Sequence, residues 1–271
     1  MDIDQIKKEF RLLDISKYPE IAKYSRDEIY DMKMGPGGLF LATLMARKLN
    51  LKPHMKVLDL GCGNGATSIF LVKNYNVKVF AVDLWIDSTT IYNRVTQHNL
   101  DDRIIPLNLD IRQKIPFAKN YFDIIFCMDS VHYYGGNLDF WEHLLPHLKS
   151  EGQLCIGSPC FNDEFSEQTL NNLPFVYDDG TDLWRNEFSK YHSPQWWKEL
   201  LEKTKKFKAI ESSETEDGII LWEDDLLNNL ENNGDIKTAL TDAAQITFRQ
   251  TGIPYLTHFV LSAIKGNDGT S

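Results

Sequence analysis

Short apolar runs between residues 56 and 158 alternate with longer segments in which apolar residues recur every three or four positions. Runs of this length are typical of buried strands, and the periodic segments between most of them are typical of helices. Regular alternation of the two predicts parallel strands joined by crossover helices. The predicted strands are 56–60, 77–82, 104–109, 122–128 and 153–158.

The alternation stops after residue 159. The segment 160–192 is rich in Asn, Asp and aromatic residues and has no clean period, so we expect an insertion over the sheet edge. Ser193 as N-cap and Pro194 in the first turn then predict a helix to about Lys205. The other predicted elements are helices at 3–13, 39–49 and 235–250 and strands at 207–213 and 255–264.

Together these elements predict an α/β fold. We expect a doubly wound, mostly parallel, seven-stranded Rossmann-like sheet, with N-terminal helices and a cap inserted after the fifth strand. Within one compact domain, residues 1–34 would form a helical lid, 35–159 the ligand-binding core, and 160–271 the cap and the last strands. Right-handed crossovers gather the carboxyl ends of parallel strands at one edge, where ligands bind.

Composition narrows the function. The chain has 271 residues, 42% of them hydrophobic, which is enough for a substantial core. A net charge of −10 argues against nucleic acid as the main partner. Its four cysteines form no CxxC pair, so we expect no metal or disulfide framework. With no evident signal peptide and no long apolar run, we expect a cytoplasmic protein, with a homodimer as one arrangement.

Glycines alternate directly after the first predicted strand, at Gly61, Gly63 and Gly65. They let the backbone approach a ligand, and the following helix offers free N–H groups. With Ala66, the turn also satisfies a dinucleotide fingerprint, so an NAD-dependent oxidoreductase is one alternative. Asp59 favours another ligand, because its carboxylate would repel a pyrophosphate but attract the ammonium of a methionine moiety.

Acidic residues also end the next strands. Asp83 lies where a carboxylate can accept both ribose hydroxyls, and Leu84 and Trp85 would lie beside an adenine. Read alone, Asp83 is also a plausible helix cap and Asp110 a turn residue.

The pattern from Asp59 to Gly65 resembles the first motif of class I S-adenosylmethionine-dependent methyltransferases, and segment 121–128 resembles their post-glycine motif. The resemblance covers residues 35–158 and implies S-adenosylmethionine as cofactor and S-adenosylhomocysteine as product. It also implies that Asp110 and its neighbouring backbone hold the adenine amino group. The cofactor-binding residues expected are Asp59, Gly61, Gly63, Gly65, Asp83, Leu84, Trp85, Asp110, Ile111 and Met128.

A closer resemblance is to a group of bacterial and archaeal small-molecule methyltransferases. It is carried by the segments 35–37, 83–86, 132–135, 192–197 and 217–222. It implies methyl transfer to a small molecule (EC 2.1.1.-), with nitrogen or oxygen as acceptor. The alternative is a non-catalytic protein that binds S-adenosylmethionine or S-adenosylhomocysteine, which would need no acceptor group near the methyl.

Candidate catalytic residues flank the expected pocket. His132 has an ordinary pKa suited to a base or orienting group. The Asp129-x-x-His132 spacing resembles, one residue short, the Asp-x-x-x-His segment of phosphoethanolamine-type N-methyltransferases. Tyr30 precedes the glycine-rich stretch 35–38, and its ring could cover the sulfonium as part of a lid.

Aromatic residues are dense in and around the insertion, beside acidic ones. They predict either an aromatic, acid-rimmed acceptor pocket or ordinary packing of a cap onto the sheet. The predicted substrate-binding residues are Tyr133, Tyr134, Trp184, His192 and Trp222.

Overall fold

The computed structural model describes residues 13–32, 34–113, 115–170, 188–224 and 254–267. Most of the predicted helix 3–13, all of the predicted helix 235–250, and Trp184 lie outside these ranges. In the part of the chain that is described, no helix has both the length and the apolar character needed to cross a membrane.

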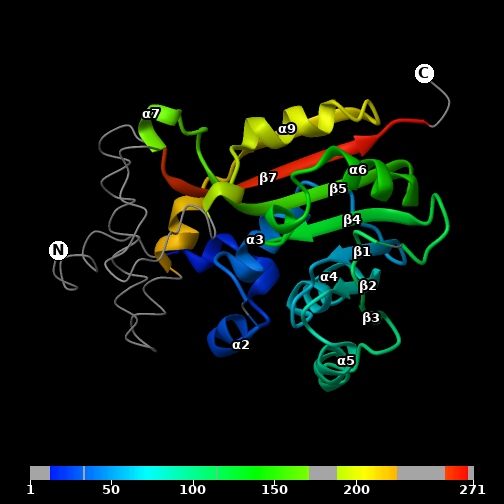
Figure 1. The fold of residues 1–271 in the computed structure, drawn as a ribbon. Helices are drawn as coiled ribbons and strands as arrows, with labels where there is room; N and C mark the ends of the chain where they lie inside the picture. The colour runs from blue at the N-terminus through cyan, green and yellow to red at the C-terminus, as the bar shows by residue number, and fades with distance from the viewer. Residues whose placement is uncertain (1–12, 33, 114, 171–187, 225–253, 268–271) are drawn as a thin grey trace, which may run out of the picture.

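The strands of the described residues form one seven-stranded sheet in the order β3-β2-β1-β4-β5-β7-β6. Strands β1 to β5 are parallel, and β7 runs antiparallel between β5 and β6 (Figure 1). The predicted mostly parallel, seven-stranded fold is therefore confirmed. The strands are β1 (Lys56–Leu60), β2 (Lys78–Asp83), β3 (Ile104–Asn108), β4 (Phe122–Met128), β5 (Leu148–Phe161), β6 (Phe207–Glu214) and β7 (Leu256–Lys265).

Successive side chains of β1 point to opposite faces of the sheet, so this strand contributes to two hydrophobic cores. Val57 belongs to the core on one face of the sheet, and Leu58 and Leu60 belong to the core on the other. Leu58 pairs with Phe80 of β2 and Ile125 of β4, so the centre of the sheet is buried on both sides. Burial on both faces explains why these strands are continuous apolar runs in the sequence.

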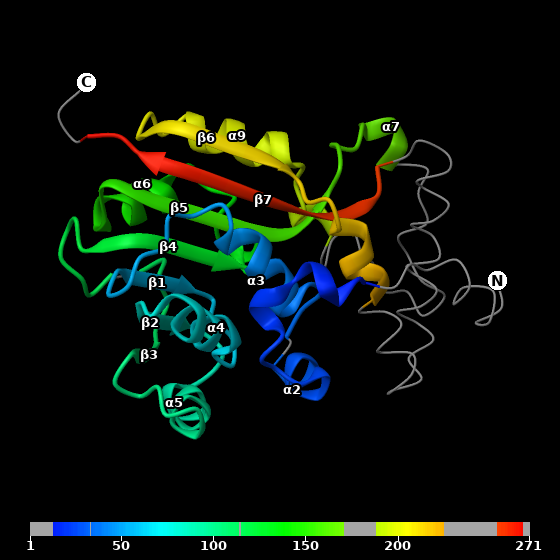
Figure 2. The same ribbon diagram turned by 180° about the vertical axis from the view of Figure 1, so that it is seen from behind.

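Helices cover both faces of the sheet, as Figures 1 and 2 show from opposite sides. Residues of α3, α4 and α5 contribute to one core, and residues of α6 and α9 to the other. The helices of at least one turn are α2 (Arg26–Asp31), α3 (Gly38–Ala46), α4 (Ala66–Tyr75), α5 (Ser88–Gln97), α6 (Leu138–Leu144), α7 (Glu167–Leu170) and α9 (Pro194–Glu202). Short 3-10 turns are η1 (Ile15–Lys17), η2 (Pro19–Ile21), η3 (Val131–Tyr133), η4 (Leu145–His147) and η5 (Phe188–Lys190).

Strand β5 is much longer than the predicted 153–158, because it pairs along nine residues with β7. Strand β7 lies about a hundred residues further along the chain, so the local sequence of β5 does not indicate this pairing. The predicted N-cap at Ser193 is present: its side chain accepts a hydrogen bond from the backbone N–H of Trp196, and Pro194 opens α9.

The N-terminal segment is joined to the region just after β6. The Tyr18 hydroxyl donates to Asp217 at 2.7 Å, and the Tyr30 hydroxyl donates to Asp224 at 2.6 Å. Residues 218–224 are helical. Two segments some 200 residues apart in the chain are thereby held together beside the carboxyl ends of the parallel strands.

Candidate functional site

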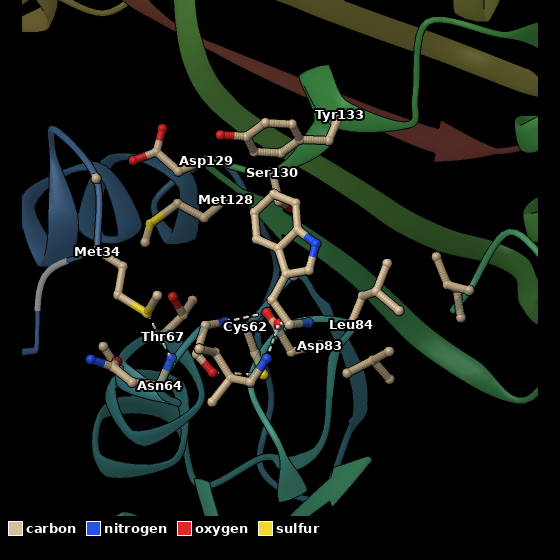
Figure 3. A pocket seen from close by; sticks show the side chains of 18 of the residues that line it. Met34, Cys62, Asn64, Thr67, Asp83, Leu84, Met128, Asp129, Ser130 and Tyr133 are labelled. Carbon is tan, nitrogen blue, oxygen red and sulfur yellow. Dashed lines mark hydrogen bonds between the residues drawn. The ribbon is translucent and has the colours of Figure 1, made fainter. Parts of the chain in front are cut away.

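A cavity of about 310 Å³ lies at the carboxyl ends of β1 to β4. Its walls come from the N-terminal segment, the glycine turn after β1, the loops after β2 and β3, and the segment after β4 (Figure 3). This is the sheet edge at which the order of strands predicts a ligand site.

The glycine turn requires its glycines. Gly61, Gly63 and Gly65 have φ of 65°, 54° and 90°, in the left-handed region that other residues rarely adopt. A Cβ on Gly61 would lie 2.4 Å from the Ser130 side chain. The N–H groups of Gly61 and Cys62 donate to Val82 O at 2.8 and 3.0 Å, which fixes the turn on the end of β2.

Asp83, the last residue of β2, organises two loops at once. Its Oδ2 accepts a hydrogen bond from Gly63 N at 2.8 Å, and its Oδ1 accepts from Trp85 N and Ile86 N at 2.8 and 2.9 Å. The carboxylate is only 8% exposed and lines the cavity. It therefore shapes the cavity wall as well as contributing charge to it.

Asp110 also lines the cavity, and it forms a two-point ion pair with Arg112. Both contacts, from Nε to Oδ1 and from Nη2 to Oδ2, measure 2.8 Å. The hydrogen bonds from Arg112 lower the pKa of the Asp110 carboxyl to about 2. A ligand that approaches this carboxylate therefore meets an ionised group that is already held in place by a neighbouring guanidinium.

Asp59 lies beneath the turn and outside the cavity lining. It is 1% exposed, and its Oδ2 accepts a hydrogen bond from Ser68 Oγ at 2.6 Å. Burial raises the pKa of the Asp59 carboxyl to about 7, with a smaller contribution in the same direction from the charge of Asp83. In this arrangement the Asp59 side chain does not reach the cavity.

The raised pKa of Asp59 predicts a pH-dependent stability. The folded protein holds the Asp59 proton more tightly than the unfolded chain does, so this contribution is lost as pH rises from about 4 through about 7. Asp59→Asn removes the ionisation and keeps an acceptor for Ser68. We expect the variant to exceed the wild type in free energy of unfolding at pH 8, by on the order of 2–4 kcal/mol, and by much less at pH 4.

Urea denaturation at pH 4, 6 and 8 measures this difference. Asp87→Asn is the control, because hydrogen bonds from Thr90 lower the pKa of Asp87 and its contribution has the opposite sign. An Asp59→Asn variant whose stability follows the wild-type pH profile would contradict the assignment.

The segment after β4 contributes four residues to the cavity lining. Asp129, with φ of 53°, and Tyr133 both line it, together with Ser130 and Tyr134. Figure 3 shows Asp129 and Tyr133 on the side of the cavity away from Asp83. The predicted residues Asp129, Tyr133 and Tyr134 thus lie in the wall of this cavity.

His132 belongs to the same segment but not to the cavity lining. It is 9% exposed, and its Nδ1 lies 3.1 Å from Ser158 Oγ of β5. Burial, with a smaller effect from the charge of Lys190, lowers the pKa of His132 to about 3. The imidazole is therefore uncharged at neutral pH and is a much weaker base than the sequence alone suggests.

Three other predicted acceptor-side residues, Tyr30, His192 and Trp222, are described by the structure and lie outside the cavity lining. Tyr30 points its hydroxyl at Asp224. His192 stacks on Trp196 with ring centroids 3.6 Å apart, and the Trp222 indole N–H donates to Thr257 O at 3.2 Å. Each side chain therefore has a structural partner of its own.

Of the predicted residues, the cavity brings together Gly61, Gly63, Asp83, Leu84, Trp85, Asp110, Ile111, Met128, Asp129, Tyr133 and Tyr134. Sequence reasoning missed Met34, Asn64 and Arg112, which also line it. The Met34 thioether accepts a hydrogen bond from Asn64 N at 3.1 Å across the turn. Only Arg112 carried a sequence signal, as a basic residue two positions after Asp110.

Comparison with known proteins finds a family model described as a methyltransferase domain at residues 57–152. The chain is 24% identical over 169 residues to phosphoethanolamine N-methyltransferase 1 of Arabidopsis thaliana, covering 58% of this chain and 33% of that protein. It is 24% identical over 129 residues to glycine/sarcosine/dimethylglycine N-methyltransferase of Actinopolyspora halophila, covering 48% and 23%. The chain thus spans a third or less of the length of these curated relatives.

A solved structure shares the fold. Phosphoethanolamine N-methyltransferase 2 of Haemonchus contortus, in complex with S-adenosyl-L-methionine, superposes with a TM-score of 0.65 at 16% identity. The match covers 94% of this chain and 61% of that one.

Proposed function

We propose that this chain, whose residues 57–152 match a methyltransferase domain, is a class I S-adenosylmethionine-dependent enzyme that methylates a small molecule on nitrogen. The observation that carries the proposal is the cavity itself. It joins the glycine turn, Asp83 and Asp129 at the carboxyl ends of the parallel strands. Bound S-adenosylmethionine supplies an electrophilic methyl group on sulfur, and S-adenosylhomocysteine is the product.

The glycine turn and the loop after β2 suit this cofactor. Gly63 has a φ of 54°, which favours glycine, and a Cβ there would lie 2.7 Å from Met34 Sδ, which also lines the cavity. Asp83 would hold the ribose hydroxyls, beside the apolar Leu84 and Trp85. Asp59, buried beneath the turn, would act on the methionine end only indirectly.

At the adenine end, we propose that the ion-paired Asp110 accepts the amino group, next to the backbone of Ile111. Met128 would line the passage toward the methyl group. These roles draw on the cavity lining and on the family resemblance.

The acceptor side supports an amine. Asp129 places a carboxylate in the cavity wall, and a carboxylate favours a ligand that carries N–H donors and takes on positive charge during the reaction. Relatives named for phosphoethanolamine and for glycine, sarcosine and dimethylglycine are also amine methyltransferases by name. An oxygen acceptor, the other sequence hypothesis, would gain less from Asp129.

The remaining parts of the chain would close the site. The bonds from Tyr18 to Asp217 and from Tyr30 to Asp224 support the division into a lid (1–34), a core (35–159) and a cap with the last strands (160–271). Closure of this kind excludes water and fixes the acceptor against the methyl, which supplies much of the rate in a displacement reaction. We propose a small molecule as the substrate. A cytoplasmic location and a homodimer stay predictions.

Calorimetry with S-adenosylhomocysteine and, separately, NADH tests the cofactor. We expect binding of S-adenosylhomocysteine at micromolar concentrations and none of NADH, and the reverse result would overturn the proposal in favour of an oxidoreductase. Incubation with methyl-labelled cofactor and phosphoethanolamine, glycine, sarcosine, dimethylglycine or a metabolite extract then tests transfer. Cofactor binding without transfer to any of these would favour a non-catalytic binding protein.

A further inference from the structure

The segment from Asp129 to Tyr134 is anchored from below by hydroxyl groups. Ser130 Oγ donates to Leu60 O, the last carbonyl of β1, at 2.8 Å. Because this bond uses the only hydroxyl hydrogen of Ser130, the Tyr134 hydroxyl donates to Ser130 Oγ, also at 2.8 Å. Tyr134 also lies 3.0 Å from Cys127 Sγ. Ser130 and Tyr134 are thereby fixed to the floor of the cavity.

A second anchor turns His132 away from the cavity. Its Nδ1 faces Ser158 Oγ at 3.1 Å, and its ring meets Tyr191 edge to face at 5.0 Å. Ser158 lies in the carboxyl-terminal part of β5 and is fully buried. The imidazole is therefore held in the packed layer between η3 and β5.

Asp129 and Tyr133 of this segment line the cavity on the side away from Asp83, the side assigned to the acceptor. Asp129 N donates to Gly157 O at 2.8 Å, which sets the direction of its side chain. The Tyr133 ring contacts the rings of Trp85 and His132, with centroid distances of 4.9 and 4.1 Å. Figure 3 shows the hydroxyl end of Tyr133 directed toward the Asp129 carboxylate.

We infer that Tyr133, rather than His132, is the catalytic residue that acts with Asp129 on the acceptor nitrogen. The inference rests on the proposed function. A neutral primary amine would donate one N–H to the Asp129 carboxylate and a second to the phenol oxygen of Tyr133, which leaves its lone pair aimed at the methyl carbon. His132 is then a positioning residue that supports the Tyr133 ring.

The charge balance of the step fits this pair. The nitrogen lone pair forms the new N–C bond as the C–S bond breaks, and the electron pair of that bond goes to sulfur. Positive charge thus moves from sulfur to nitrogen, and the product is an N-methylammonium beside Asp129, which later loses its extra proton to solvent. The negative charge of Asp129 stabilises the nitrogen as it becomes positive.

Sinefungin provides a test that needs no known acceptor, because it carries an amine where the cofactor carries its methyl sulfonium. We would measure by calorimetry the affinities of sinefungin and S-adenosylhomocysteine for the full chain and its variants. Tyr133→Phe is expected to lower the affinity for sinefungin about tenfold, the loss of one hydrogen bond to a charged group, and to leave that for S-adenosylhomocysteine within about twofold.

Two further variants complete the test. Tyr92→Phe on the exposed face of α5 should leave the ratio of the two affinities unchanged. His132→Asn keeps a partner for Ser158 but removes the ring that supports Tyr133, so it should lower the ratio less than Tyr133→Phe does. An unchanged ratio in Tyr133→Phe, or a reduced ratio in His132→Asn alone, would overturn the inference. If the wild type binds neither ligand, the proposed function fails instead.

Discussion

Asp83→Asn is expected to weaken the binding of S-adenosylhomocysteine more than a hundredfold. The two carboxylate oxygens of Asp83 accept N–H groups from different loops, Gly63 on one and Trp85 and Ile86 on the other. The amide of the variant has an N–H₂ group in place of one carboxylate oxygen. This group cannot accept a hydrogen bond from the backbone N–H groups that the oxygen bound. Hydrogen bonds to a charged group contribute about 1.5–3 kcal/mol each, and the ribose contact is expected to be lost as well.

Calorimetry measures this loss, and thermal unfolding shows whether the variant is folded. Asp102→Asn is the matched control, because Asp102 is exposed and lies before β3, away from the cavity. Affinity within threefold of the wild type would show that the charge of Asp83 does not organise the cofactor site.

Gly61→Ala is expected to destabilise the protein by about 2–5 kcal/mol and to abolish detectable cofactor binding. A left-handed φ costs a non-glycine residue about 1–2 kcal/mol. The new methyl group would also lie 2.4 Å from the Ser130 side chain, an overlap that costs about 1–3 kcal/mol to relieve. Urea denaturation measures the first effect and calorimetry the second.

A double-mutant cycle separates the two causes. In a Ser130→Gly background the overlap is absent but the φ cost remains, so Gly61→Ala should cost less there than in the wild type. Gly266→Ala is the control, because its nearest contact is 3.6 Å away and its φ is not in the left-handed region. Equal costs of Gly61→Ala in both backgrounds would mean that Ser130 does not crowd the turn.

The contact made by Tyr30 could not be predicted from its neighbours in the sequence. Tyr30 was predicted to cover the cofactor because it lies just before the glycine-rich stretch. In the fold its hydroxyl is used by Asp224, 194 residues along the chain, and its ring lies outside the cavity lining. The cap residue Trp184 lies outside the described ranges, so its role stays a prediction.

The parallel core and the sheet edge that holds the cavity follow from local sequence patterns. The apolar runs of β1, β2 and β4 are local signals of strands buried on both faces, and the glycine turn after β1 is written in consecutive residues. Since the carboxyl ends of parallel strands share one edge, Asp83, Asp110 and Asp129 could be assigned to one site before any coordinates.

Which side chain of each loop faces the cavity depends on tertiary contacts. Asp59 is drawn beneath the turn by Ser68, and His132 is turned into the protein by Ser158, while Tyr133, the next residue, enters the cavity. Adjacent residues point in different directions, and partners from other elements, Ser68 of α4 and Ser158 of β5, hold Asp59 and His132 in place. The local spacing of residues predicts neither the direction of each side chain nor its partner from a distant part of the chain.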